Sequence, residues 1–417
     1  MSTFALPTPD APRTVTERPL TRASIALTAL LGAVLIFDGF DMVVLGYLAP
    51  AVSGEFKIGR VAMGLVITVA HLGVMLGGVL GGLAGDRFGR RPMLLTSVAG
   101  FGAGTVLCAL ADSQSRFVLF RFLASICMGA ASPNIATYLI EILPKRWAGR
   151  LSMFAYTAYA LGGTLCGITA KIVLPSVGWR RVFEIGGFAP LLVLFPVLLW
   201  ALPESPRFLF EARRSIQWRA LFANHGGTVA GLAFLALLLY FASVAFNSMG
   251  TLMLTSLGLS TGDAVSALLA NNIAGLVGSL ASALGMHRFG SKKILVTWLA
   301  SGALCVLVLA ALTLDHGLPR MAIVVPFALC GFGVASSLMI LFPLAAHAFP
   351  TEMRSSGTGA VTSIGRIGAM VSSTVVAMLM GAVGVAGTFL SLAAILIAAA
   401  SVAFLIRRHI PAALERS

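Results

Sequence analysis

The chain has 417 residues, of which 58% are hydrophobic and only 11% are charged, and its mean hydropathy is +0.96. These values lie outside the range of a soluble domain and predict a protein that spans a membrane. The formal net charge of +14 could indicate nucleic-acid binding, but the basic residues stand in short clusters between apolar stretches. That distribution is typical of loops on one membrane face. We therefore expect a lipid bilayer as the environment and no nucleic-acid partner.

Twelve apolar stretches are long enough to cross a bilayer, which takes about 20 residues each. They lie near residues 23–50, 60–84, 92–112, 116–143, 149–174, 182–202, 227–257, 262–286, 294–314, 319–348, 356–382 and 385–406. The expected fold class is therefore an all-α membrane protein. Its domains are an N-terminal tail (1–22), a first six-helix bundle (23–202), a linker (203–226), a second six-helix bundle (227–406) and a C-terminal tail (407–417). The linker is too short for a domain and is expected to form an amphipathic surface helix.

The distribution of lysine and arginine predicts the orientation. The tails, the linker and the even-numbered loops hold 20 of the 29 basic residues, the opposite side holds seven, and Arg121 and Arg366 lie inside spans. The positive side of such proteins is cytoplasmic, so both termini are expected there. Residues 1–22 have no apolar core or cleavage site, and no signal peptide is expected. The five cysteines lie singly within apolar stretches and predict neither disulfides nor a metal site, and no cofactor is expected.

The two halves of the sequence resemble each other. A Gly-Asp-Arg-Phe-Gly-Arg-Arg segment (85–91) follows the second span, and Met-His-Arg-Phe-Gly-Ser-Lys-Lys (286–293) follows the eighth. A duplication of this kind places the substrate at the interface between two related bundles.

Asp38 and Asp41 are the acids of the first span. Their spacing of three residues puts both carboxylates on one face of a helix. A carboxylate within a bilayer is costly unless it is paired, hydrated or protonated, so these residues are candidates for proton coupling. The alternative is that either acid belongs to a structural ion pair.

Arg121 and Arg366 are candidates for binding a substrate carboxylate, because a guanidinium binds that group through parallel hydrogen bonds. Arg121 should lie ~8 Å below the outer end of the fourth span, while Asp41 and Asp38 lie ~14 and ~18 Å below the end of the first. Arg121 can therefore reach Asp41, and it is alternatively a permanent partner of that acid. Arg366, midway along the eleventh span, is alternatively a helix-packing clamp.

Other polar residues are expected at similar depth and could bind a hydroxylated ring. They are His71, Asn247, Asn271 and Asn272, with Phe37, Phe40, Tyr47 or Tyr240 as neighbours for the ring plane. His71 could also carry protons or simply be satisfied by a neighbouring helix. Asn271 and Asn272 point about 100° apart, so only one should face the cavity.

Charged residues at the inner ends of the helices predict a gate. The set comprises Asp86, Arg87, Arg90, Arg91, Glu141 and Arg150. The alternative is that these charges only reflect the positive cytoplasmic side of the membrane topology, which explains the arginines but not the acids.

GGLAGDRFGRR resembles the second–third loop signature of the major facilitator superfamily. Within that superfamily the chain resembles the aromatic acid:proton symporters. This resemblance is carried by DGFD with GYLAP in the first span and by RFLASICMGAASPNIA in the fourth. YLIEILPKRWAGR, PESPRFL and GTGAVTSIGRIGA add to the match, whereas His287 stands where the second-half loop often has Asp. The resemblance implies the major facilitator fold with two pseudo-symmetric bundles.

It also implies proton-coupled uptake of a small aromatic carboxylate of the benzoate or hydroxybenzoate class across a bacterial inner membrane, by a monomer whose coupling ion is the proton. The alternatives are a proton-coupled exporter of drugs or organic cations and a porter of sugars or other metabolites. A sensor would carry a soluble output domain, and an intramembrane enzyme would need a nucleophile–base pair or metal cluster at suitable depth. We therefore expect no enzymatic activity.

Overall fold

The computed structural model describes residues 20–205, 218–313, 320–350, 354–406 and 409–410. Over these ranges the regular structure is helical, and twelve segments are long and apolar enough to cross a membrane. This confirms the predicted fold class and all twelve predicted spans. In a bilayer the backbone N–H and C=O groups must be satisfied within the chain, and a helix does so within each span.

The described part of the first half contains eight helical segments that make six spans, because the last three segments follow one another directly. They are α1 (Arg22–Phe56), α2 (Arg60–Phe88), α3 (Arg90–Ala109), α4 (Gln114–Ile142), α5 (Lys145–Val177), and the sixth span of α6 (Trp179–Ala189), the π-helical η1 (Pro190–Leu194) and α7 (Phe195–Ala201).

In the described ranges the second half makes six spans from five helices. They are α9 (Trp218–Ser256), α10 (Thr261–Leu312), α11 (Arg320–Ala348), α12 (Arg354–Ala382) and α13 (Gly384–Leu405). Helix α10 holds two spans, because the chain turns back at Gly290, whose φ of 77° and ψ of 160° are outside the helical region. A positive φ carries no steric penalty at glycine, which explains the residue at this turn.

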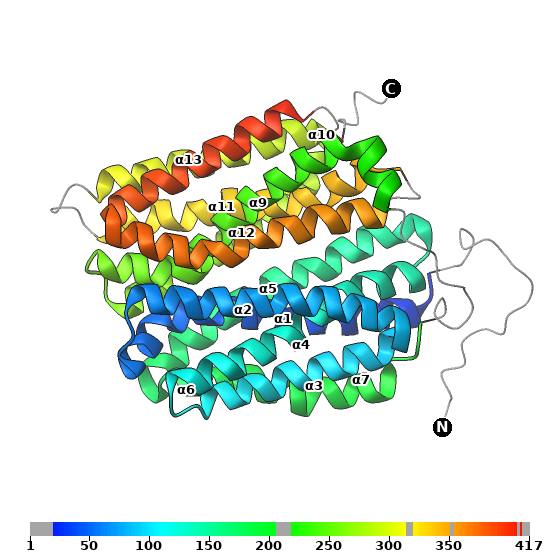
Figure 1. Cartoon of the computed structure of the whole chain (residues 1–417), viewed down its shortest axis with the longest axis horizontal. Coiled ribbons are helices and arrows are strands. Elements are labelled where there is room, and N and C mark those ends of the chain that lie inside the picture. The colour runs from blue at the N-terminus through cyan, green and yellow to red at the C-terminus, as the bar shows by residue number, and fades with distance from the viewer. Residues whose placement is uncertain (1–19, 206–217, 314–319, 351–353, 407–408, 411–417) are drawn as a thin grey trace, which may run out of the picture.

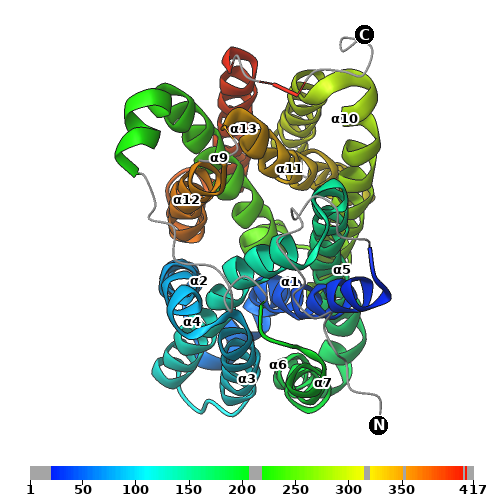
Figure 2. The same ribbon diagram turned by 90° about the vertical axis from the view of Figure 1, so that its right-hand side faces the viewer.

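The two halves form separate groups of helices. Helices α1–α7 fill the lower part of Figure 1 and α9–α13 the upper part, and the end-on view of Figure 2 shows the same division. Helix α1 begins and α13 ends on the same side of the molecule, at the right in Figure 1. We call this side the terminal face and the other the opposite face. The predicted linker helix and the domain limits stay predictions, because residues 206–217 lie outside the described ranges.

The larger buried apolar cluster extends across both halves, and a smaller one lies within the first half. In the first half Leu94, Phe101 and Met128 pack with residues of α1 and η1. In the second half Phe246 packs against Phe327, with ring centroids 5.8 Å apart. In this state the larger cluster therefore also holds the two halves against each other.

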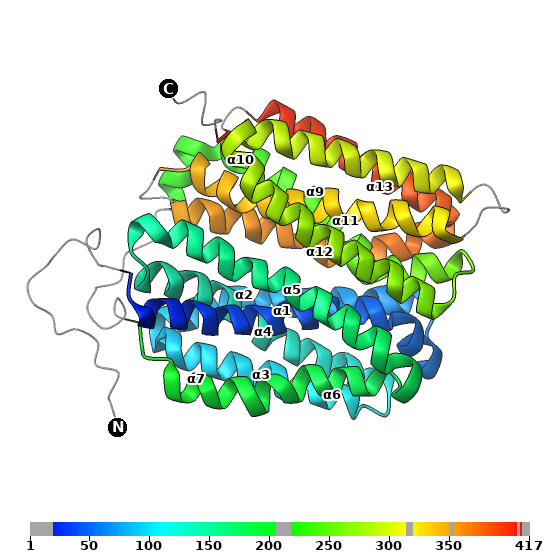
Figure 3. The same ribbon diagram turned by 180° about the vertical axis from the view of Figure 1, so that it is seen from behind.

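Three pairs of helices make most of the contacts between the halves. Helix α1 meets α9 where the Thr251 hydroxyl donates to the Gly46 carbonyl, and a Cβ at Gly46 would overlap the α9 backbone. Helix α2 meets α12 where Thr68 and Thr374 share a hydrogen bond of 2.8 Å between their hydroxyl oxygens. Helix α5 meets α10, which crosses towards it in Figure 3, and Asn272 stands opposite the α5 glycines there. These contacts lie at mid-membrane or nearer the opposite face.

Candidate functional site

Close packing of α2 against α4 positions the first group of polar side chains. A Cβ at Gly73, Gly77 or Gly81 would overlap atoms of α4, so these small residues allow the two helix backbones to approach closely. Small residues at four-residue spacing are the usual means by which membrane helices associate. The contact presents Arg121 of α4 towards α1.

Arg121 and Asp41 form a buried ion pair between α4 and α1. Arg121 Nη1 donates to both carboxylate oxygens, at 2.8 and 2.7 Å, and Nη2 donates to the Asp41 backbone carbonyl at 2.8 Å. The Thr105 hydroxyl of α3 donates to the same carboxylate at 3.1 Å. The two charged side chains are only 3% and 2% exposed. The predicted reach of Arg121 to Asp41 is confirmed, and the positive charge of Arg121 is balanced within the protein.

Asp38 lies one turn from Asp41 and faces the same helix, as their spacing predicts. Its carboxylate accepts a hydrogen bond of 3.0 Å from the Ser132 hydroxyl of α4, and the residue is 4% exposed. Among the described residues Asp38 forms no ion pair within 4.0 Å, although Arg366 and Asp41 both act on it electrostatically. Asp38 is therefore a buried acid held by a hydroxyl group.

Arg366 crosses from the second half to the first. Its Nη1 donates to the Val74 carbonyl of α2 at 3.3 Å, and Gly78 leaves room for the guanidinium. Its positive charge also acts electrostatically on the Tyr240 side chain of α9. Arg366 is half-buried and, in the part of the chain that the structure describes, forms no ion pair. It thus combines a charge inside the membrane with a neutral set of partners.

A small cavity lies beside Arg121 at the junction of the two halves. The centre of a water molecule can occupy ≈ 10 Å³ of this cavity, which is about enough space to hold one water molecule. Two buried polar atoms on its wall, Arg121 Nε and Ser125 Oγ, have no hydrogen-bond partner. His71 also lines it and uses Nδ1 in a 2.9 Å hydrogen bond with the Ile67 carbonyl. The complete lining is Met42, Leu45, Ile67, Ala70, His71, Val74, Arg121, Ser125, Met128 and Ser248.

The two adjacent asparagines point in different directions. Asn272 donates to the Tyr47 hydroxyl of α1 at 3.0 Å and so faces the interface between the halves. Asn271 instead packs against Gly331 of α11, inside the second half. The predicted divergence of the two side chains is therefore correct.

The other polar and aromatic candidates are less central. Asn247 donates to the Ser243 carbonyl of its own helix at 3.0 Å. Phe37 is partly buried against the core of the first half, and Tyr47 is completely buried. Asn247 and Phe37 are thus held by neighbours within their own halves, whereas Tyr47 is bonded across the interface by Asn272.

The charged residues predicted as a gate lie together at the terminal face, within the first half. Arg90 pairs with Asp86 at 2.6 Å and lies 3.8 Å from Glu141. Asp86 is 55% exposed, whereas Arg90 and Glu141 are 12% and 4% exposed. Arg91 donates to the Leu199 carbonyl at 2.9 Å, and Arg87 lies over the Phe88 ring. The side chains of Arg150 and His287 lie outside the described part of the structure.

Glu204 holds this cluster together, although the sequence analysis did not single it out. One of its carboxylate oxygens accepts from the backbone N–H groups of Arg90, Arg91 and Ser205, at 2.9, 3.2 and 2.8 Å. Two of those groups open α3, where an acid is favourable because the free N–H groups carry partial positive charge. Thr105 and Ser132 were missed as well, since a hydroxyl residue in an apolar span has no distinctive sequence signal.

Comparison of the sequence with known proteins identifies a family. The sequence model of the Major Facilitator Superfamily matches residues 30–373 and 232–417. The chain is 32% identical to a gallate transporter of Pseudomonas putida, over 88% of this chain and 89% of the relative. It is 28% identical to the 4-hydroxybenzoate transporter of Acinetobacter baylyi, over 95% and 94% of the two chains.

The fold is also that of a solved structure. A crystal structure of a D-xylose-proton symporter superposes with a TM-score of 0.80 at 21% identity, covering 92% of this chain and 97% of that one. At this identity the likeness concerns the fold alone. With twelve membrane spans in two six-helix halves, and a family match that covers most of the sequence, the chain belongs to the Major Facilitator Superfamily and is a transporter of that family, not an enzyme.

Proposed function

We propose that the protein moves small aromatic carboxylates across a bacterial inner membrane together with protons, by alternating access. The observation that carries this proposal is the contrast between the two intramembrane arginines. Arg121 is neutralised by Asp41, whereas Arg366 stands at the interface of the halves with no ion-pair partner among the described residues. The relatives that transport gallate and 4-hydroxybenzoate support the aromatic acid as substrate.

Arg366 would bind the substrate carboxylate. A lone cation at mid-membrane is unfavourable without an anion or water, so an anionic substrate gains a strong interaction there. Tyr240, on which the guanidinium acts electrostatically, belongs to the second half, while Val74 and Asp38 belong to the first. A substrate at this position therefore contacts both halves, as alternating access requires.

Asp38 would couple the proton to the substrate. Arg366 acts electrostatically on Asp38, and a bound carboxylate would cancel the positive charge of Arg366. Protonation of Asp38 then becomes more favourable when substrate is bound, and by linkage the proton favours substrate binding. The Asp41–Arg121 pair would keep α1 and α4 in register and supply a second acid. Asn272, Tyr47, His71, Asn247, Asn271 and Phe37 would complete the polar and aromatic surroundings of the ring as the halves move.

The terminal face would be cytoplasmic, because the loops and helix ends on that side carry most of the lysine and arginine. The contacts between the halves at and beyond mid-membrane then represent a state closed towards the outside. A substrate would leave this state towards the cytoplasm, which is the direction of uptake.

The Asp86 cluster would control the rate of alternation. Asp86→Asn is expected to lower the transport rate several-fold with little change in substrate affinity, because the cluster lies at the terminal face and away from Arg366. The measurement is initial uptake as a function of substrate concentration. Asp112→Asn is a matched control, because Asp112 pairs with Arg116 at the same 2.6 Å and the same four-residue separation, on the opposite face. Loss of equilibrium binding in Asp86→Asn, or an equal rate loss in Asp112→Asn, would contradict the gate.

The proposed substrate class is tested by an uptake panel in cells that lack their own aromatic-acid carriers. Radiolabelled gallate, 4-hydroxybenzoate, gentisate, a cationic dye and xylose are compared with the same vector without insert. Accumulation of one or more aromatic acids, abolished by a protonophore, is expected. Accumulation of xylose, or export of the dye without any uptake of acid, would assign the protein to a different substrate class.

A further inference from the structure

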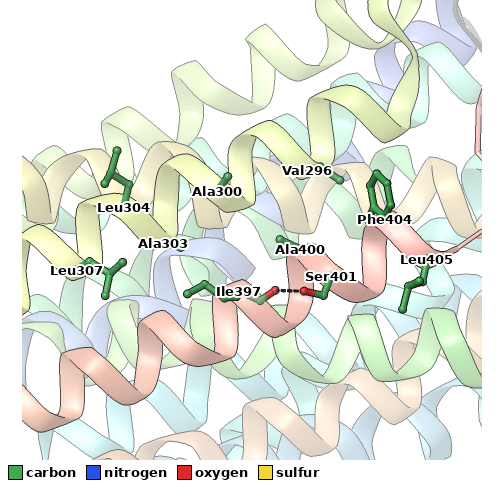
Figure 4. A pocket seen from close by; sticks show the side chains of 10 residues that line it. All are labelled: Val296, Ala300, Ala303, Leu304, Leu307, Ile397, Ala400, Ser401, Phe404 and Leu405. Carbon is green, nitrogen blue, oxygen red and sulfur yellow. Dashed lines mark hydrogen bonds between the residues drawn. The ribbon is translucent and has the colours of Figure 1, made fainter.

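A shallow apolar groove runs between α13 and the second span of α10. Its volume is about 550 Å³, and its lining residues form one stripe on each helix. Figure 4 shows the two stripes facing one another, with small side chains at the centre and larger ones at the ends. The lining residues are Val296, Ala300, Ala303, Leu304, Leu307, Ile397, Ala400, Ser401, Phe404 and Leu405.

The groove offers no polar group that would select a polar ligand. Ser401 is the one polar residue in its lining, and its hydroxyl donates to the Ile397 carbonyl of its own helix at 3.0 Å. Leu304, Phe404 and Leu405 are 62%, 62% and 74% exposed, so the groove opens outward from two membrane-spanning helices. Its occupant must therefore be apolar along this length and come from the surrounding bilayer.

The length of the groove matches one leaflet. Val296 and Leu307, the first and last lining residues on α10, are separated by eleven helical residues, or ~16 Å along the axis. One leaflet contributes about 15 Å of a hydrocarbon core of about 30 Å. Val296 lies nearer the terminal face than Leu307, because α10 runs away from that face after Gly290. An acyl chain of the leaflet at the terminal face fits this length.

A basic group stands at the terminal-face end of the groove. The Lys292 ammonium lies 4.4 Å from the centroid of the Phe404 ring, which itself lines the groove. Arg288 and Lys293 are exposed on the same turn of chain. Within the described ranges none of these three residues forms an ion pair. Their charges are therefore available to an anion at the level of the lipid headgroups.

The chain after α13 fixes the position of this basic group. Ser291 N–H donates to the Ile410 carbonyl at 2.9 Å, and the Ile410 N–H donates to the Ser291 hydroxyl at 2.8 Å. Burial, and to a lesser extent the nearby Lys292, lowers the pKa of His409 below its ordinary value. The positive charge of Lys292 therefore lies at the mouth of the groove, on a segment that is hydrogen-bonded to the chain after α13.

We propose that the groove binds an anionic glycerophospholipid of the leaflet at the terminal face. One acyl chain lies between α10 and α13, and the phosphate lies beside Lys292. The apolar lining, the one-leaflet length and the unpaired basic group at one end each match a different part of such a lipid. The site is in the second half and remote from Arg366, so it is independent of the proposed transport function.

Native mass spectrometry of the detergent-purified full-length protein tests this site. The protein is titrated with phosphatidylglycerol and with phosphatidylethanolamine of identical acyl chains, and the bound fractions are compared. The wild type is expected to prefer the anionic lipid. Lys292→Gln should weaken phosphatidylglycerol binding by roughly 5-fold, the effect of one basic residue near an anionic headgroup. Ala400→Phe, which fills the groove, should weaken the binding of both lipids.

Matched substitutions elsewhere serve as controls. Lys171→Gln removes an exposed lysine of α5, and Val193→Phe enlarges a side chain that is 65% exposed on η1. Neither should change lipid binding. Equal affinity of the wild type for the two headgroups, or equal losses in Lys292→Gln and Lys171→Gln, would overturn the proposal. Efficient cross-linking of α10 to α13 between copies in liposomes would also overturn it, because the groove would then be a subunit interface.

Discussion

Asp41→Asn is expected to abolish accumulation of substrate, so that the internal concentration never exceeds the external one. The substitution leaves the Arg121 guanidinium buried without its anion, and removing one member of a buried pair costs about 3–5 kcal/mol. It also removes one of the two acids of α1. Uptake of a radiolabelled aromatic acid into energised cells, normalised to the amount of protein in the membrane, measures the effect.

Two further variants separate the charge of Asp41 from its packing. Asp41→Asn combined with Arg121→Gln removes both charges and should restore the amount of folded protein without restoring accumulation. Thr105→Val removes only the 3.1 Å hydrogen bond to Asp41 and should keep most of the activity. Full accumulation by the Asp41→Asn and Arg121→Gln double variant would show that the pair has a structural role alone.

Arg366→Lys is expected to weaken binding of the aromatic carboxylate by roughly 1–3 kcal/mol, the scale of a charged hydrogen bond. Lysine keeps the positive charge but loses the planar group that can donate two parallel hydrogen bonds. Arg366→Ala should lose the acid more completely, while affinity for the neutral amide of the same acid stays nearly unchanged. Competition of each acid and its amide against a radiolabelled substrate gives both affinities.

The corresponding substitution at the other arginine is the control for Arg366. Arg121→Lys disturbs the pair with Asp41 and should therefore affect the acid and the amide alike. Equal losses of acid and amide in Arg366→Ala would indicate that Arg366 is a packing clamp. A selective loss of the acid in Arg121→Lys would transfer the role of carboxylate anchor to Arg121.

The membrane spans were predictable because each depends on a local property, a long apolar run between charged or turn residues. The structure adds what the runs do not encode. The sixth span contains the π-helical η1, and α10 folds back at Gly290 without a separate loop. Hydropathy reports the length of an apolar run but not the backbone geometry within it, so neither feature could be predicted from it.

The charged residues of the candidate site were predictable because charge is rare within the membrane spans. Asp38, Asp41, Arg121 and Arg366 are conspicuous because ionisable residues are costly within a bilayer, and depth along the helices predicted that Arg121 reaches Asp41. The uncharged partners were not predictable. The Ser132 hydroxyl that bonds Asp38 is one of many hydroxyl groups in the spans, and only the packing of α4 against α1 selects it.

The same limit applied at the terminal face. Asp86 and Glu141 stood out as acids among arginines, whereas Glu204 lies in the sequence beyond the sixth span. Its role follows from the position of the α3 N-terminus, where the backbone N–H groups of Arg90 and Arg91 face its carboxylate. Contacts between segments so far apart in sequence depend on the arrangement of the whole half.

Coupled movement of substrate and protons is the central claim, and purified protein in proteoliposomes tests it most directly. Uptake of a radiolabelled aromatic acid and the internal pH are recorded together after an inward gradient of the acid or of protons is imposed. The account predicts accumulation driven by the proton gradient, proton movement with the acid in the same direction, and loss of both in Asp38→Asn. Accumulation that persists with a protonophore, or acid transport without any change in internal pH, would contradict it.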